Sequence, residues 1–365
     1  MNVVELTKEL VKIDSDISVG EKQVAMFIYD YLCELGIDAE LVEFAANRAD
    51  VVASIGAGDG LMINGHIDVV PIGDRSQWRH TPGSTDNGIL YGRGTSDMKG
   101  GVACVLSALS KADLHKPKRR LLLVFVGGEE TAFDGSYYLL EKKRALFDGV
   151  KQGIIAEPTD MKIQVAQKGI VEMAVAFTGK AAHGSRPWQG DSAILKATAF
   201  INEYMKYSKH FNVEDSLLGK GSVNIGMING GTASNVVPDR CELKIDRRIV
   251  PGETPQLAVA QVRGVLEKLK IDAKIDLQIA RNAFRLPDNS RVVKIIKSVA
   301  GAKTPLMGAT GYTEAELYKT KANIDSVVFG PGVKEVIHQA DEYIPVANLT
   351  RYSAMMEKLI KQWIG

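Results

Sequence analysis

The sequence is poor in cysteine, carries almost no net charge and contains no long apolar run. Its three cysteines, Cys33, Cys104 and Cys241, are widely spaced without a C-x-x-C pair, which favours buried thiols in a reducing compartment over disulfides. The 45 basic and 44 acidic residues leave a net charge of +1, so nothing favours nucleic acid or an anionic membrane as partner. No stretch approaches the roughly 18 consecutive apolar residues of a membrane span. Without a signal peptide either, we expect a cytoplasmic protein.

The composition is that of a globular protein, with 45% hydrophobic and 24% charged residues. At 365 residues the chain exceeds the length at which a single core stops growing, which predicts two domains. In its first part, strand and helix patterns alternate, which is typical of an α/β sheet. The run at 120–126 is almost entirely apolar and predicts a strand buried on both faces of that sheet.

The middle of the chain has a different pattern, in which apolar residues alternate along strands and recur at helical spacing between them. The predicted strands are 171–177, 222–228, 241–249 and 274–279, and the predicted helices are 191–207 and 254–269. The order β-α-β-β-α-β describes a small split unit with its own core. We therefore predict a larger domain formed by residues 1–168 and 283–365, with a smaller domain at 169–282 inserted into it.

A histidine and a carboxylate follow the apolar run at 61–63. His66 and Asp68 are two residues apart, and such residues point to the same side of a strand. A histidine that binds metal usually donates its other ring N–H to a carboxylate, so the pair suits a metal site. An isolated H-x-D pair is more often a solvated strand end, and further ligands are needed to decide between the two.

Further candidates stand mostly at the ends of predicted strands. They are Asp97, Glu129, Glu130, Glu157 and His338. Alone, an acidic pair is more often a solvated turn and a single histidine a surface residue. Together, two neighbouring carboxylates after a dry apolar strand repel each other unless a cation lies nearby. Histidine and carboxylate ligands without paired cysteines suit zinc, with cobalt or manganese as alternatives.

Seven motifs occur in order along essentially the whole chain. They are G-H-I-D-V-V-P at 65–71, G-R-G-T-S-D-M-K-G-G at 92–101, G-G-E-E at 127–130, E-P-T at 157–159, G-K-A-A-H-G-S-R-P at 179–187, N-V-V-P-D at 235–239 and I-H-Q-A-D-E at 337–342. The ordered set resembles the dizinc amidohydrolases and peptidases that include acetylornithine deacetylase, succinyl-diaminopimelate desuccinylase and carboxypeptidase G. The resemblance implies a catalytic domain with a mixed, mostly parallel sheet between helices. It also implies that the inserted domain is a βαββαβ (ferredoxin-like) lid and dimerisation domain.

The same resemblance implies two divalent metal ions, zinc first. The implied ligands are Asp97 as the bridge, His66 and Glu157 at one metal, and Glu130 and His338 at the other. Asp68 would orient His66, and Glu129 would act as general base on a metal-bound water. The peptide bond after Asp97 would be cis.

The remaining expected site residues concern the substrate. By resemblance, His183 stabilises the developing oxyanion, in dimeric members across the subunit interface, although an ordinary loop histidine is the alternative. Arg248 resembles the arginine that binds the substrate α-carboxylate, a role that suits its planar fork, unless it is an ordinary surface cation. Asn235 adds hydrogen bonds, and Thr310 and Gly311 lie in a loop that offers backbone amides.

These expectations describe a homodimeric hydrolase of the amide bond in N-acyl amino acids, of the acetylornithine deacetylase or succinyl-diaminopimelate desuccinylase type. A carboxypeptidase-G-like or dipeptidase activity on small peptides is the alternative, because the same site cleaves both kinds of amide. A binding protein without activity would be expected to have lost ligands, whereas every expected ligand and the base are present. One departure concerns the position two residues before Glu129. Many relatives carry an acidic or polar residue there, and this chain has Gly127-Gly128 before the acidic pair.

Overall fold

The computed structural model describes residues 1–365, which form two compact units. The first unit comprises residues 1–165, 286–307 and 317–365, and the second comprises 166–285 and 308–316. The domain bounds expected from the sequence differ from these limits by a few residues and by the segment 308–316. Because a compact unit need not fold as a separate domain, those bounds remain a prediction.

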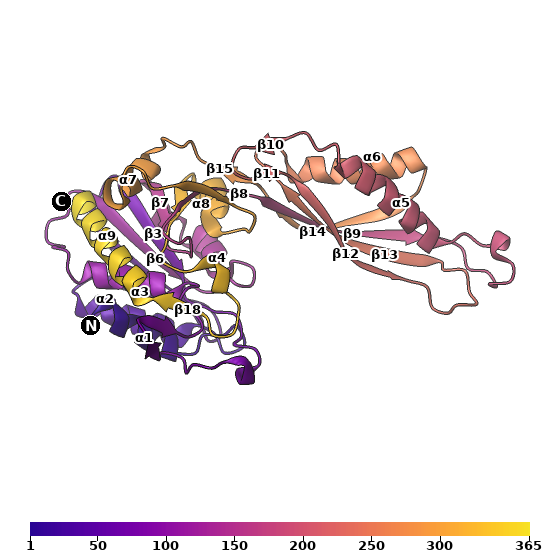
Figure 1. The fold of residues 1–365 in the computed structure, drawn as a ribbon. Coiled ribbons are helices and arrows are strands. Elements are labelled where there is room, and N and C mark those ends of the chain that lie inside the picture. Colours follow the sequence, from indigo (N-terminus) through magenta and orange to yellow (C-terminus); the bar gives the residue numbers. More distant parts are fainter. The chain divides into compact units, whose positions relative to one another are not determined.

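A large mixed sheet forms the centre of the first unit (Figure 1). Its strands, in spatial order, are β1 (Ala39–Ala45), β2 (Arg48–Ile55), β6 (Arg120–Val126), β3 (Gly60–His66), β7 (Val150–Ile155), β17 (Asp325–Val328) and β8 (Ile163–Gln167), with β16 (Leu306–Ala309) beside β8. The four strands from β6 to β17 are parallel, and the flanking pairs are antiparallel. β3 and β6 are buried almost completely, which confirms the predicted buried strand at 120–126.

Helices cover both faces of this sheet. They are α1 (Val3–Lys12), α2 (Lys22–Glu34), α3 (Lys99–Leu109), α4 (Asp134–Lys142), α7 (Arg291–Ala300), α8 (Glu314–Ala322), whose first turn belongs to the second unit, and α9 (Val346–Ile364). Gly65 of β3 faces α3, because a side chain there would meet Val102. The preceding Asn64 faces the opposite side, where its amide donates to the Tyr318 hydroxyl of α8 at 3.0 Å. None of the helices combines the length and the hydrophobicity that a membrane-spanning segment needs.

Short elements complete the first unit. They are the 3₁₀ helices η1 (Arg75–Gln77), η2 (Arg144–Phe147) and η4 (Lys334–Val336), and a small sheet of β18 (Tyr343–Pro345), β5 (Ile89–Tyr91) and β4 (Thr85–Asp86). In this sheet Tyr343 pairs with Tyr91. The segment that follows His338 therefore lies beside the segment that precedes Asp97.

The second unit has the β-α-β-β-α-β order expected from the sequence. Its antiparallel sheet has the spatial order β12 (Ser222–Gly230), β13 (Arg240–Ile249), β9 (Gly169–Thr178) and β14 (Ala273–Arg281), which is the ferredoxin-like order. Helices α5 (Ala193–Ser208) and α6 (Pro255–Leu269) lie on one face, where Phe200 and Val262 join Val175 and Leu243 in one core (Figure 1). The shorter elements are η3 (Pro187–Gln189), β10 (Glu214–Asp215) with β11 (Gly219–Lys220), and β15 (Phe284–Arg285), which pairs with the end of β8.

Candidate active site

The metal-ligand candidates of the first unit come together at the carboxyl ends of its parallel strands. His66 is the last residue of β3, Glu129-Glu130 follow β6, and Glu157 follows β7. Parallel strands end at the same edge of a sheet, which is where open α/β sheets bind their ligands. Asp97 stands in the loop before α3, and His338 in the loop before β18.

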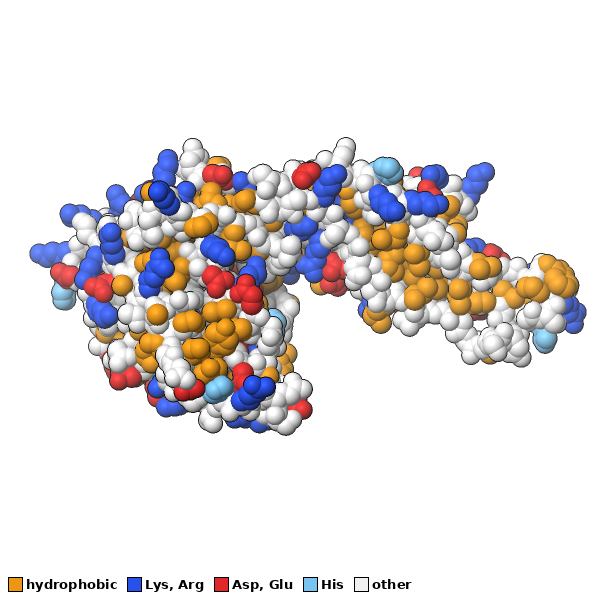
Figure 2. Space-filling view, viewed as in Figure 1, with side chains coloured by type: hydrophobic (Ala, Val, Ile, Leu, Met, Phe, Trp, Pro, Cys, Tyr) orange, Lys and Arg blue, Asp and Glu red, His pale blue; other side chains and the backbone are white.

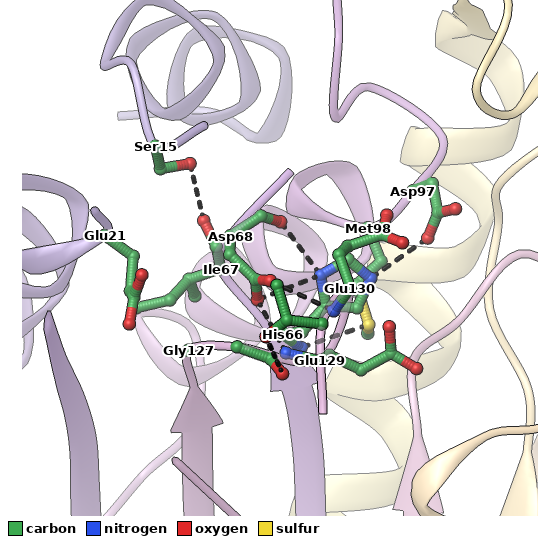
Figure 3. Close-up of polar contacts among 12 residues, drawn as sticks. Ser15, Glu21, His66, Ile67, Asp68, Asp97, Met98, Gly127, Glu129 and Glu130 are labelled. Atoms are coloured by element: carbon green, nitrogen blue, oxygen red, sulfur yellow. Dashed lines mark hydrogen bonds and ion pairs between the residues drawn. The ribbon is translucent and has the colours of Figure 1, made fainter. Parts of the chain in front are cut away.

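The carboxylate of Asp97 contacts two histidines, one with each oxygen. Its Oδ1 lies 3.0 Å from Nε2 of His66 (Figure 3), and its Oδ2 lies 3.3 Å from Nε2 of His338. On the His66 side, Glu157 Oε1 lies 3.7 Å from the same ring nitrogen. On the His338 side, Glu130 Oε1 lies 3.1 Å from the ring nitrogen. The five side chains therefore form two groups that share Asp97.

Burial and crowding shift the pKa values of these groups. Burial alone would lower the pKa of His66, but the carboxylates of Glu157 and Asp97 outweigh it and raise that pKa well above its usual value. Burial raises the pKa of Glu157 to about 8, against the opposing effect of His66. Hydrogen bonds to Asp97 and Glu130 raise the pKa of His338 to about 10. Both shifts favour the protonated form of the histidine, and a metal ion that binds there would have to displace these protons.

Asp68 is completely buried and binds the backbone of the acidic pair. Its Oδ1 accepts a hydrogen bond from the Glu129 N–H at 3.2 Å, and its Oδ2 accepts one from the Glu130 N–H at 3.1 Å (Figure 3). The His66 Nδ1 lies 2.9 Å from the Asp68 carbonyl oxygen and 3.7 Å from its carboxylate. The carboxylate was expected to orient His66, but the backbone carbonyl makes the shorter contact. The peptide bond between Asp97 and Met98 is cis, as expected from the resemblance.

Charged residues that the sequence did not single out surround the turn before the acidic pair. Asp50 of β2 accepts a hydrogen bond from the Gly127 N–H at 2.9 Å. A Cβ atom on Gly127 would overlap the buried carboxylate of Glu21, and one on Gly128 would overlap the guanidinium of Arg48. The two glycines therefore leave room for an ion pair between the buried Glu21 and the half-buried Arg48, whose Nε lies 3.2 Å from Glu21 Oε1. The only sequence signal was Asp50, a charged residue at the start of an apolar strand.

Two of the expected substrate residues lie in the second unit and contact close neighbours in sequence. His183 is exposed, and its Nδ1 lies 2.8 Å from the hydroxyl oxygen of Ser185. Arg248 donates from Nε and Nη2 to the two carboxylate oxygens of Asp246, at 2.9 and 3.1 Å. The planar fork that was expected to bind a substrate carboxylate thus already binds one from the protein.

The other expected substrate residues also belong to the second unit. The carbonyl oxygen of Asn235 accepts a hydrogen bond from the Gly184 N–H, so that the Asn235 segment lies beside the His183 loop. Thr310 and Gly311 are exposed in the loop after β16. None of these three residues makes a side-chain contact that singles it out for a role.

Comparisons with known proteins agree with this architecture. Residues 62–362 match the sequence model of peptidase family M20/M25/M40. A probable succinyl-diaminopimelate desuccinylase of Staphylococcus aureus (strain N315) is 30% identical over 400 residues, covering 99% of this chain and 97% of the relative.

Two solved structures share the fold over nearly the whole chain. A tripeptidase from Staphylococcus aureus subsp. aureus Mu50 has a TM-score of 0.81 at 23% identity, covering 100% of this chain and 98% of the tripeptidase. A dinuclear metal-binding peptidase from Bacillus subtilis has a TM-score of 0.72 at 17% identity, covering 99% and 97% of the two chains. With its motifs, its cluster of possible metal ligands and the match over residues 62–362, this chain belongs to peptidase family M20/M25/M40 and is a hydrolase of that family.

Proposed function

We propose that this protein hydrolyses the amide bond of N-acyl amino acids, in the manner of succinyl-diaminopimelate desuccinylase or acetylornithine deacetylase. The observation that carries the proposal is the contact of Asp97 with both His66 and His338, next to the acidic pair. The name of the relative that is 30% identical favours the succinyl over the acetyl substrate.

The residues present fit a pair of divalent metal ions. Ligand atoms lie within 4.8 Å of one another in two overlapping triplets, which are His66, Glu129 and Glu157, and His66, Asp97 and Glu130. The buried carboxylates of Asp97 and Glu157 repel each other, and a cation would remove that cost. We propose that Asp97 would be a ligand of both ions, and that His66 and Glu157 would complete one site and Glu130 and His338 the other. The nitrogen and oxygen donors favour zinc, then cobalt or manganese.

Glu129 is the proposed general base. When bound, the metal pair lowers the pKa of a water molecule and balances the negative charge that develops on the carbonyl oxygen. The Glu129 carboxylate takes the proton of the attacking water and delivers it to the leaving nitrogen. The adjacent Glu130 contacts His338, so the two neighbouring carboxylates have separate tasks. Asp68 fixes both backbone N–H groups of the pair, which supports a defined direction for the Glu129 side chain.

The second unit supplies the proposed substrate contacts. Arg248 binds the α-carboxylate of the substrate, and the Asp246 carboxylate in its fork supports this proposal because both ligands have the same shape and charge. His183 stabilises the oxyanion, and Asn235, Thr310 and Gly311 contribute hydrogen bonds to the substrate. For the α-carboxylate to bind in this fork, it has to replace the carboxylate of Asp246.

We also propose that the protein is a homodimer through the second unit. Most of the exposed large apolar side chains of the protein belong to the second unit. Figure 2 shows hydrophobic side chains along the visible face of this unit. The exposed apolar side chains of the unit include Trp188, Leu195, Met227, Ile228 and Leu277. Sedimentation velocity tests this proposal, and a monomer at all concentrations would contradict it.

Cleavage of small peptides is the second candidate. It is favoured by the structural likeness to a tripeptidase, and both kinds of substrate contain an amide bond next to a carboxylate. A released-product assay separates the candidates when the zinc- or cobalt-loaded protein is given N-succinyl-diaminopimelate, N-acetylornithine, and simple di- and tripeptides. We expect the N-acyl amino acids to be cleaved fastest. Turnover of the peptides alone would contradict the deacylase proposal.

A further inference from the structure

Glu342 is a fully buried carboxylate that the proposed reaction does not use. It is the last residue of the I-H-Q-A-D-E motif and stands four positions after His338. Burying a charged carboxylate costs free energy unless its oxygens receive hydrogen bonds. The partners of this side chain therefore indicate what the fold gains from it.

Its partners are the residues that lead to Asp97. One carboxylate oxygen, Oε1, accepts hydrogen bonds from the backbone N–H groups of Gly94, Ser96 and Asp97, at 3.0, 2.9 and 3.1 Å. The other oxygen, Oε2, accepts one from Nη1 of Arg93 at 2.6 Å. Three amide groups directed at one oxygen fix the course of the backbone up to Asp97 itself.

The segment before Asp97 also donates hydrogen bonds to the backbone of Glu342 and Tyr343. The Gly92 N–H donates to the Glu342 carbonyl oxygen at 2.8 Å, and the Ser96 hydroxyl donates to the Tyr343 carbonyl oxygen at 2.7 Å. The backbone that carries Asp97 is thus held against the backbone that follows His338. Because these contacts involve backbone atoms, they do not depend on the metal ligands themselves.

We propose that Glu342 is a positioning residue, which holds the Asp97 carboxylate at the right distance from His338 for both metal ions to bind. The inference rests on the proposed function, since it takes these two residues as metal ligands. The alternative is that Glu342 only stabilises the fold as half of a buried ion pair with Arg93. Both roles predict a loss of stability on substitution, but only the positioning role predicts a loss of metal affinity.

The second unit offers a matched control. Glu253 is also buried, pairs with the buried Arg247 and accepts a hydrogen bond from the Val250 N–H at 3.0 Å. It contacts none of the proposed metal ligands. Glu253→Gln therefore measures what the loss of a buried charge does to stability alone.

The test compares Glu342→Gln, Glu253→Gln and the wild type in full-length protein. Glutamine keeps the size of the side chain and an acceptor oxygen but removes the charge. Zinc affinity is measured by chelator competition, and unfolding of the metal-free protein by thermal denaturation. We expect both variants to unfold at lower temperature, and only Glu342→Gln to bind at least one zinc ion more weakly, by roughly 10- to 100-fold. Its kcat should also fall more than its KM changes.

Equal zinc affinity in Glu342→Gln and the wild type would overturn the proposal. If Glu342→Gln does not fold, Glu342→Asp takes its place, because it keeps the charge but shortens the reach to the three amide groups. It should bind zinc more weakly than the wild type, and equal affinity would overturn the inference. A wild type that binds two zinc ions but cleaves no tested substrate would contradict the proposed function alone. The zinc affinities would still decide the role of Glu342.

Discussion

The side chains of the proposed metal ligands contact one another across long stretches of the chain, whereas the side chains of His183 and Arg248 contact close neighbours in sequence. His66 and Asp97 are 31 positions apart, and Glu130 and His338 are 208 apart. In the second unit, His183 contacts Ser185 and Arg248 contacts Asp246, each two positions away. Substitutions in the first unit should therefore affect the fold and the metal site together. Substitutions of His183 and Arg248 in the second unit should affect substrate binding and turnover with little effect on the fold.

The largest effect is expected from substitution of Glu129, the proposed base. This substitution tests whether catalysis can be lost in the first unit while the fold is kept. Glu129→Gln should lower kcat by about 10²–10⁴-fold, because the glutamine amide cannot take the proton of the attacking water. Initial-rate kinetics measure the loss, and metal analysis provides the control, since the proposed ligands are intact. Unchanged kcat with two bound metal ions would eliminate Glu129 as the base.

The second prediction tests how closely the first unit is packed. Gly127→Ala should lower the free energy of unfolding by roughly 1–3 kcal/mol, because its methyl group would overlap the Glu21 carboxylate. Gly264→Ala is the control, since a Cβ on this glycine of α6 meets nothing within 4 Å and alanine favours a helix. Urea denaturation measures both variants. Equal stability of Gly127→Ala and the wild type would show that the turn can move without cost.

The third prediction asks whether the second unit acts in recognition. Arg248→Ala should raise KM about tenfold for a substrate with a free α-carboxylate, because a charge-assisted hydrogen bond contributes about 1.5–3 kcal/mol. The matching α-amide should be affected much less. Arg240→Ala is the control, since this exposed arginine also pairs with a carboxylate two residues away on β13. If both substrates respond equally to Arg248→Ala, the carboxylate does not bind there.

The fourth prediction concerns pH. Burial raises the pKa of Glu21 from 4.5 to about 7, although Arg48 opposes the shift. Protonated Glu21 therefore stabilises the folded state. This contribution is complete below pH 4.5 and is lost as the pH rises through about 7. Glu21→Gln should thus gain stability relative to the wild type, by at most roughly 3 kcal/mol, between pH 4.5 and 8. Thermal unfolding across this range measures the difference, with the exposed Glu43→Gln as control, and a constant difference would contradict the shift.

The strands that carry the site could be predicted from the sequence because their composition reflects their burial. Apart from Arg120, the run at 120–126 is apolar, and β6 covers the same residues. Helix α4 was not predicted, because half of its buried face consists of the small residues Gly135 and Ser136. The contact of Arg248 with Asp246 follows from the alternation of strand side chains and could have been anticipated.

The buried charges could not be predicted, because their partners are distant in sequence. The buried Glu21 accepts a hydrogen bond from Arg48, which is 27 positions away, and the buried Glu342 binds backbone groups about 245 positions away. In a sequence, such residues look like ordinary surface charges. Only the packing of the strands and loops shows that they are buried and what they hold.

The space shared by Glu21 and Gly127 limits the order in which this sequence can change. A side chain at position 127 overlaps the Glu21 carboxylate, so it becomes acceptable only after position 21 has been shortened. The two substitutions should therefore be strongly non-additive, as contacting residues are. An evolutionary path that places a polar residue before the acidic pair has to begin at the start of α2, more than a hundred residues earlier in the chain.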